Sequence, residues 1–173
     1  TYQDASGSKA GASFSFADCL RSLPLSDTID LAALSGLDQL RLMLDGRMPA
    51  APIAETVGFR LTELEAGRVA FEGEPTLAVY NPIGSVHGGW MATLLDSACG
   101  CAVHSALKPG QAYTTLELKT VFHKALKAGT PVRAEGRIVQ AGRRAAFSEA
   151  DLRGLDGTLY ATATSTCLVM ERS

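Results

Sequence analysis

A long apolar stretch in the middle of the chain dominates the pattern of hydrophobic and polar positions. Between Glu74 and Lys108, Asp96 is the only side chain with a formal charge, and most of the other residues are small or apolar. A run that is uncharged on nearly every face is typical of a buried helix rather than of a surface helix. We therefore predict one long buried helix, entered through residues 81–84 and ended by residues 108–110.

Shorter patterns on both sides of this stretch predict a second helix and a set of strands. Ser35 suits a helix N-cap, apolar residues recur on one face after it, and Gly46 followed by Pro49 ends the helix. From Pro52 onward the pattern changes to that of strands. Two short strands surround the turn at 65–68 and four longer ones follow the buried helix, placed around Phe59 and Leu61 and over Arg68–Gly73, Tyr113–His123, Val132–Gln140, Arg144–Leu152 and Leu159–Val169.

These elements predict a single α+β domain over residues 35–173. The connections between strands are short, which favours antiparallel pairing. An antiparallel β-sheet wrapped around the long helix also explains why that helix has no polar face. Residues 1–34 show no clean periodicity and are predicted to form an N-terminal arm.

Composition and charge narrow the classes of function. The chain has 173 residues, 46% of them hydrophobic, and a net charge of −2, so it suits one globular domain and offers no basic surface for nucleic acid. The Trp90–Leu107 run approaches membrane-span length, but Asp96 and other polar residues make it a poor span. No signal peptide is visible and the cysteines form no paired motif. We expect a cytoplasmic protein with reduced thiols and no membrane partner.

The chemistry of the chain is concentrated at the start and in the middle of the buried helix. His87, Gly88 and Gly89 occupy the helix start, where backbone N–H groups lack helical partners and the dipole favours negative charge. An acyl carbonyl bound there would have its developing oxyanion stabilised by a main-chain N–H. Asp96 would then activate water as a general base or attack the carbonyl itself.

The spacing of these two groups has a geometric consequence. Gly88 and Asp96 are eight residues apart, which is about 12 Å along one helix. One reacting carbon cannot lie within about 3 Å of both groups at that separation. A two-fold dimer with antiparallel neighbouring helices would bring Gly88 of one chain near Asp96 of the other and create two composite sites.

These motifs together resemble a known family. The pattern Asn81-x-x-Gly-x-x-His-Gly-Gly, followed by Leu95-Asp96-Ser-Ala, is similar to that of hot-dog-fold thioesterases of the phenylacetate-degradation (PaaI-like) type. The likeness extends over residues 35–169, including the strand from Tyr113 to Lys119 and the Ala-Gly-Arg-Arg turn. It implies a hot-dog fold, a homodimer or dimer of dimers, and hydrolysis of an aryl- or medium-chain acyl-CoA without a metal or a separate cofactor.

The resemblance also implies roles for single residues. By position, Asp96 matches the catalytic carboxylate and Gly88 the oxyanion N–H, while Asn81 matches the amide that orients carboxylate or water. His87 corresponds to the residue that steadies the turn. A hydroxyl after the helix helps to hold the water. Alignment on Glu117 makes that hydroxyl Thr115, whereas strand alternation would favour Thr114; we prefer Thr115. The basic turn residues Arg143 and Arg144 are the candidates for binding the phosphates of coenzyme A.

Alternative interpretations stay open at this point. Asp96 could be a structural carboxylate, Arg143 and Arg144 an ordinary solvated turn, and Cys101 with His104 a nucleophile–base pair. A dehydratase acting on acyl thioesters is a rival enzyme, although such enzymes place their histidine and carboxylate differently. A hot-dog protein that binds acyl-CoA or another small ligand without turnover is the rival from another class.

Overall fold

The structure, a computed structural model, describes residues 29–172, of which the part from Leu31 onward belongs to one compact unit. The predicted N-terminal arm over residues 1–34 falls almost entirely outside the described residues, so its extent stays a prediction.

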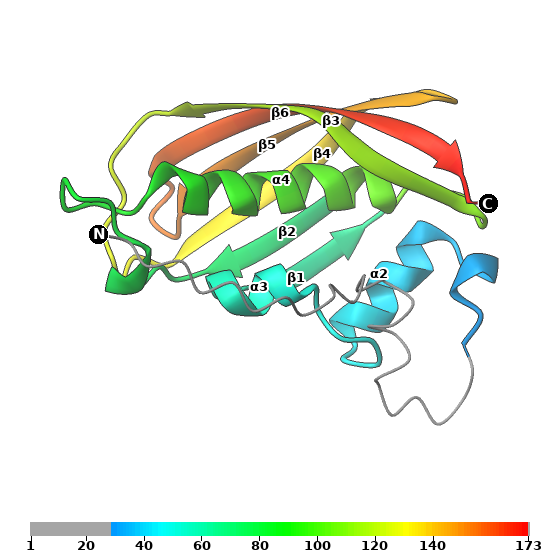
Figure 1. The fold of residues 1–173 in the computed structure, drawn as a ribbon, viewed down its shortest axis with the longest axis horizontal. Helices are drawn as coiled ribbons and strands as arrows, with labels where there is room; N and C mark the ends of the chain where they lie inside the picture. Colours follow the sequence, from blue (N-terminus) through cyan, green and yellow to red (C-terminus); the bar gives the residue numbers. More distant parts are fainter. Residues whose placement is uncertain (1–28, 173) are drawn as a thin grey trace, which may run out of the picture. The chain divides into compact units, whose positions relative to one another are not determined.

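The unit is built on one antiparallel sheet of six strands (Figure 1). The strands follow the spatial order β1-β2-β4-β5-β6-β3, so that the first strand and the third form the two edges. Their bounds are β1 (Phe59–Glu65), β2 (Arg68–Gly73), β3 (Gln111–Phe122), β4 (Val132–Ala141), β5 (Ala145–Gly154) and β6 (Leu159–Glu171). All six predicted strands are confirmed, with ends that differ by a few residues.

A single long helix, α4 (Gly88–His104), lies across one face of this sheet (Figure 1). Its apolar residues Leu94, Leu95 and Ala98 are fully buried against the strands. The sheet approaches very closely at Gly136 of β4, where a Cβ atom would lie 2.2 Å from the carbonyl oxygen of Ala98. This arrangement is the sheet around one buried helix that the pattern predicted and the hot-dog fold that the resemblance implied, and it explains the missing polar face of the helix.

Two short helices precede the sheet on the side of β1 (Figure 1). The predicted helix after Ser35 is confirmed as α2 (Gly36–Leu44), and the Ser35 hydroxyl accepts a hydrogen bond from the N–H of Asp38 at 3.2 Å. Two 3₁₀ turns complete the secondary structure, η1 (Leu31–Ala33) and η2 (Leu77–Val79).

The strand pattern predicted from Pro52 onward is wrong for its first residues, which form the helix α3 (Pro52–Val57). Proline at the first helical position has the φ angle that a helix needs and loses no hydrogen bond there. The helix ends at Gly58, whose φ of 81° is the left-handed conformation that favours glycine. Six residues are too few to display a helical period, so the pattern hid this element.

None of the helices between residues 29 and 172 is long and apolar enough to cross a bilayer.

Candidate active site

The start of α4 is organised by the side chain of His87. This residue is the N-cap, with extended backbone angles, and its ring nitrogen Nδ1 accepts a hydrogen bond from the N–H of Gly89 at 2.9 Å. The backbone N–H of His87 donates to the carbonyl of Val79 at 2.8 Å. A Cβ atom on Gly89 would lie 2.9 Å from Nδ1, so only glycine lets the ring fold back over the helix start. His87 therefore steadies the turn and must present an unprotonated Nδ1.

The next N–H group, that of Gly88, is free. It has no hydrogen-bond acceptor among the described residues, whereas the N–H groups of Gly89 and Trp90 are both used. The ring of Phe122 lies against Gly88, and a Cβ atom added there would come within 3.0 Å of it. A free N–H at the positive end of a helix is the group that an oxyanion hole requires.

Asp96 lies two turns further along α4 with its carboxylate half-buried. Thr115 of β3 donates a hydrogen bond from Oγ1 to Oδ1 of Asp96 at 3.3 Å. No cationic side chain among residues 29–172 forms an ion pair with this carboxylate. A half-buried carboxylate held by one hydroxyl and not neutralised by a cation suits a base or nucleophile better than a structural ion pair.

A β-bulge explains why Thr115, and not Thr114, reaches the helix. The pairing of β3 with β6 shifts between Thr115 and Glu117, which leaves Leu116 as the extra residue. Leu116 is 62% exposed, so the simple alternation with Leu118 that favoured Thr114 is interrupted there. The expectation for Thr114 is wrong for that reason, and its side chain points away from α4 and is exposed.

Asn81 lies in the loop that enters α4, and its amide is used within that loop. Its Oδ1 accepts hydrogen bonds from the N–H groups of Ile83 and Ser85, and its Nδ2 donates to the hydroxyl of Ser85. Asn81 lines the same cavity as Gly88, with a volume of about 300 Å³. Asp96 does not line this cavity. The chain thus gathers Asn81, His87 and Gly88 at the start of α4 and holds Asp96 with Thr115 elsewhere.

The basic turn between β4 and β5 lies near the pair formed by Asp96 and Thr115. Arg143 and Arg144 connect β4 to β5, are exposed, and have no acidic partner in the described part of the chain. The carbonyl of Arg144 accepts a hydrogen bond from the N–H of Val169, which pairs in the sheet with Tyr113. The turn is therefore two strand spacings, about 10 Å, from the Thr115 end of β3.

The chain is similar in sequence and in fold to known proteins. Residues 83–161 match the family model of the thioesterase superfamily. The solved structure of a phenylacetic acid degradation-related protein from Ralstonia eutropha JMP134 is 32% identical, with a TM-score of 0.68; the alignment covers 74% of this chain and 97% of that one. The chain belongs to the thioesterase superfamily. Within it, the likeness is to the PaaI-like proteins of phenylacetic acid degradation, and the protein is a thioester hydrolase.

Two further relatives of this thioesterase are connected with coenzyme A, one by its substrate and one by a bound ligand. The 1,4-dihydroxy-2-naphthoyl-CoA hydrolase of Listeria monocytogenes is 26% identical over 91 residues, which are 53% of this chain and 73% of that enzyme. A protein from Streptococcus mutans UA159, solved bound to acetyl CoA, is 27% identical with a TM-score of 0.62, covering 67% of this chain and 92% of that one.

The thioesterase also contains a pair of contacts that the pattern did not single out. The hydroxyl of Tyr113 lies against Gly100, where a Cβ atom would come within 2.6 Å of it. The Tyr113 ring packs edge-on against His104 with centroids 5.7 Å apart. Tyr113 precedes Thr115 by two positions on the same side of β3, which is the one sequence signal that could have revealed it.

The alternative nucleophile pair in α4 is disfavoured by its surroundings. Burial, with the nearby Asp96 carboxylate, raises the pKa of the Cys101 thiol to about 12. Burial also lowers the pKa of His104 to about 4. A thiol that stays protonated is a poor nucleophile, so we interpret Cys101 and His104 as structural residues and not as a nucleophile–base pair.

Proposed function

We propose that this thioesterase hydrolyses acyl-CoA and that its catalytic unit is a two-fold dimer. The observation that carries the proposal is the separation of a free N–H group and a carboxylate without a cationic partner on one helix. The free N–H of Gly88 and the carboxylate of Asp96 are eight residues apart on α4, about 12 Å along its axis. Each group needs the other at one reacting carbon, so the second must come from a partner subunit.

Two features of the fold support such a dimer. β3 is an edge strand, so its outer backbone groups can pair with the same strand of a second copy. The half-buried positions of α4 near Asp96 are small, since they include Ala92, Thr93 and Ser97. Small residues let two antiparallel helices approach closely enough for Gly88 of one subunit to meet Asp96 of the partner subunit.

The proposed reaction uses the two groups in turn. The thioester carbonyl accepts a hydrogen bond from Gly88, and a water molecule held by Asp96 of the partner subunit attacks the carbonyl carbon. Asp96 takes the proton of that water, the C–S bond breaks, and the proton passes to the departing thiolate. The products are a carboxylic acid and free coenzyme A. Direct attack by the carboxylate would give the same products through an anhydride that water opens.

Neighbouring residues take supporting roles in this proposal. Thr115 fixes one oxygen of the carboxylate and leaves the other for the water. His87 keeps the helix start in place, and Asn81 shapes the loop beside Gly88. Arg143 and Arg144 are placed to bind the phosphates of coenzyme A bidentately. No metal or separate cofactor enters the reaction.

The acyl group we propose is an aryl or medium-chain one, and the setting is the cytoplasm. Relatives named for phenylacetic acid degradation and for a naphthoyl-CoA substrate support the aryl choice. Cys99, Cys101 and Cys167 are free thiols in the described part of the chain, which agrees with a reducing compartment.

The test is thiol release from phenylacetyl-CoA, a hydroxybenzoyl-CoA and a medium-chain acyl-CoA, comparing wild type with Asp96→Asn. This substitution keeps the shape of the side chain and removes the base, so the rate should fall by about two or more orders of magnitude. Equal rates would make Asp96 structural. Thermal stabilisation by acyl-CoA without any thiol release would instead identify a binding protein, and reversible water addition to an enoyl thioester would identify a dehydratase.

A further inference from the structure

Two cavities flank the first turn of α4, one on each side of Gly88. The β3 pocket, of about 300 Å³, is lined by Gly88 itself together with Asn81, Met91, Phe122, Lys124 and Ala125. The α3 pocket, of about 370 Å³, is lined by Val57, Ala78, Tyr80, His87, Trp90 and Thr93. Gly88 lines the β3 pocket, and its neighbours His87 and Gly89 line the α3 pocket, so the two substituents of a carbonyl bound at Gly88 have a separate pocket on each side.

The two pockets differ in chemistry. The basic residues Lys124 and His123 line the β3 pocket beside its apolar residues. None of the residues that line the α3 pocket carries a formal charge, and its walls include Val57, Tyr80 and the indole of Trp90. An apolar cavity of this size with few polar groups suits an uncharged acyl group.

The position of the basic turn indicates the direction of the coenzyme arm. Arg143 and Arg144 belong to the end of the sheet that carries Thr115, and Thr115 bonds Asp96 of the same chain. In the proposed dimer the basic turn that lies near Gly88 is therefore that of the partner subunit, which also supplies the carboxylate. The coenzyme would then reach Gly88 from the β3 side. The acyl group must leave the carbonyl carbon in the opposite direction, past the helix start and toward α3.

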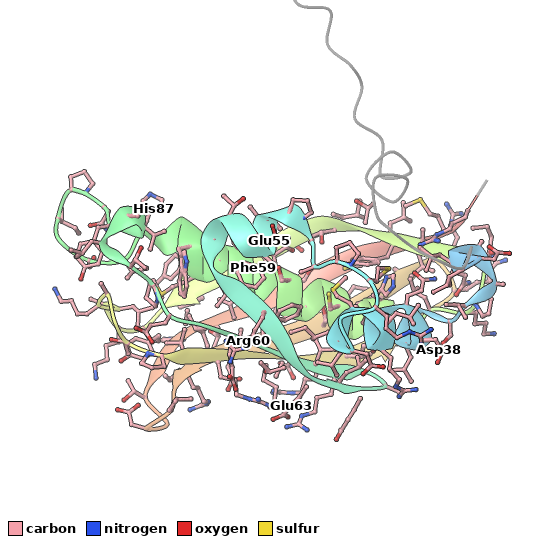
Figure 2. All side chains as sticks on the ribbon, turned by 90° about the horizontal axis from the view of Figure 1, so that it is seen from below. Asp38, Glu55, Phe59, Arg60, Glu63 and His87 are labelled. Atoms are coloured by element: carbon pink, nitrogen blue, oxygen red, sulfur yellow. The ribbon has the colours of Figure 1, made fainter. Side chains whose placement is uncertain are left out.

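We infer that the α3 pocket binds the acyl group and that the pantetheine arm crosses the β3 pocket. This assignment rests on the proposed acyl-CoA thioesterase function. Under this assignment α3 forms one wall of the pocket that selects the acyl group. Trp90 Nε1 donates a hydrogen bond to the carbonyl of Val57 at 2.8 Å, and this bond holds the end of α3 against α4. Figure 2 shows His87 at the end of the molecule where α4 begins, with α3 alongside the helix.

Matched substitutions at two exposed alanines test the assignment. Ala78→Leu fills part of the α3 pocket and Ala125→Leu fills part of the β3 pocket, with the same added volume. With acetyl-CoA and hexanoyl-CoA as substrates, Ala78→Leu should lower kcat/KM about tenfold or more for hexanoyl-CoA and little for acetyl-CoA, because each buried methylene contributes about fourfold. Ala125→Leu should lower kcat/KM for both substrates by a common factor, because both share the pantetheine arm.

A binding experiment separates this inference from the proposed function. The thioethers S-ethyl-CoA and S-hexyl-CoA cannot be hydrolysed, so calorimetric dissociation constants for them require no turnover. Wild type should bind S-hexyl-CoA about tenfold or more tightly than S-ethyl-CoA, and Ala78→Leu should abolish that preference. The assignment is overturned if wild type shows no preference for the longer chain, or if Ala125→Leu and not Ala78→Leu removes it. If wild type shows the binding preference but releases no thiol, the proposed acyl-CoA hydrolysis is wrong and the assignment of the two pockets stands.

Discussion

At the scale of single residues, the helix start depends on one imidazole acting as a cap. Because Nδ1 of His87 accepts from Gly89, the ring contributes as an acceptor at a position where Ser, Asn and Asp usually stand. This geometry fixes the direction of the neighbouring Gly88 N–H. The histidine is thus explained without a proton transfer.

Replacing His87 distinguishes the cap from an acid–base role. His87→Ala should lower the free energy of unfolding by about 1 kcal/mol and reduce kcat, because the cap is lost and the helix start loosens. His87→Asn keeps an acceptor and should retain most of both. Urea unfolding and thiol release measure the two effects. If His87→Asn folds normally and is as inactive as Asp96→Asn, His87 takes part in proton transfer.

A second histidine makes stability depend on pH. The folded pKa of His104 is about 4, lowered by burial and by Arg172 from an ordinary value of 6.5. The unfolded chain therefore binds one more proton than the folded chain between these values, and stability falls as the pH is lowered through this window.

The expected loss is roughly 1–3 kcal/mol across the window. Urea unfolding of wild type and His104→Gln above, within and below it measures the effect, and the variant should lose clearly less. Hydrogen bonds to Arg133 and Arg68 lower the pKa values of Glu63 and Glu135 respectively. The stability that these two carboxylates contribute is lost as the pH falls through their lowered folded pKa values. Parallel curves for the two proteins would show that His104 does not cause the dependence.

At the scale of elements, β3 contacts α4 at three points. Phe122 lies on Gly88, Thr115 bonds Asp96, and Tyr113 lies on Gly100. The two aromatic rings fit over glycines on either side of Asp96. The distance between strand and helix, and with it the reach of Thr115, is therefore set by the absence of side chains at two helix positions.

A double substitution tests whether the contact between Tyr113 and Gly100 positions β3 on α4. Gly100→Ala places a methyl group within 2.6 Å of the Tyr113 hydroxyl, and should destabilise the fold by about 1–3 kcal/mol and lower kcat as Thr115 is displaced. Tyr113→Phe removes the hydroxyl and should change little alone. The double variant should recover most of the lost stability and kcat, which is a coupling that a double-mutant cycle measures. Additive losses would show that the contact does not position β3.

At the scale of the whole molecule, the proposed dimer predicts that two differently impaired chains complement one another. Gly88→Pro removes the proposed oxyanion donor at the first helical position, where proline is tolerated, and His87 before it already has the extended backbone that proline demands. Asp96→Asn removes the base. Each variant alone has two incomplete sites in the proposed dimer.

Mixed dimers of Gly88→Pro and Asp96→Asn should regain activity, because one of their two sites combines an intact Gly88 with an intact Asp96. Random mixing by co-expression gives about half mixed dimers, so about a quarter of wild-type activity is expected. Gly88→Ala, which keeps the N–H and adds only the contact with Phe122, is the control for steric effects. Activity no higher than that of the separate variants would place each site within one subunit.

The fold could be predicted from the sequence because its long elements carry strong patterns. α4 and the four strands after it are each ten or more residues long, so period and composition identify them. α3 has six residues and was missed for that reason. Asp96 and the His-Gly-Gly start of α4 stood out as polar groups within an apolar helix, and the structure leaves both available for chemistry.

The rest of the site depends on tertiary contacts that no local pattern encodes. Nothing near Gly100 or Tyr113 in the sequence shows that the two touch. The choice between Thr114 and Thr115 depended on an irregularity in strand pairing, which only the partner strand β6 reveals. The path of the substrate depends likewise on which cavities the folded loops leave beside Gly88.

The bulge at Leu116 divides β3 into two segments in which opposite sets of alternate residues face α4. Before it, odd-numbered residues such as Tyr113 and Thr115 face α4; after it, even-numbered ones such as Leu118 do. The extra residue shifts the alternation by half a period, so that one strand places Thr115 against the Asp96 carboxylate at one end and Leu118 against the hydrophobic core at the other. Deleting it would force a choice between the two, since a strand of uniform phase can keep Thr115 or Leu118 inward but not both.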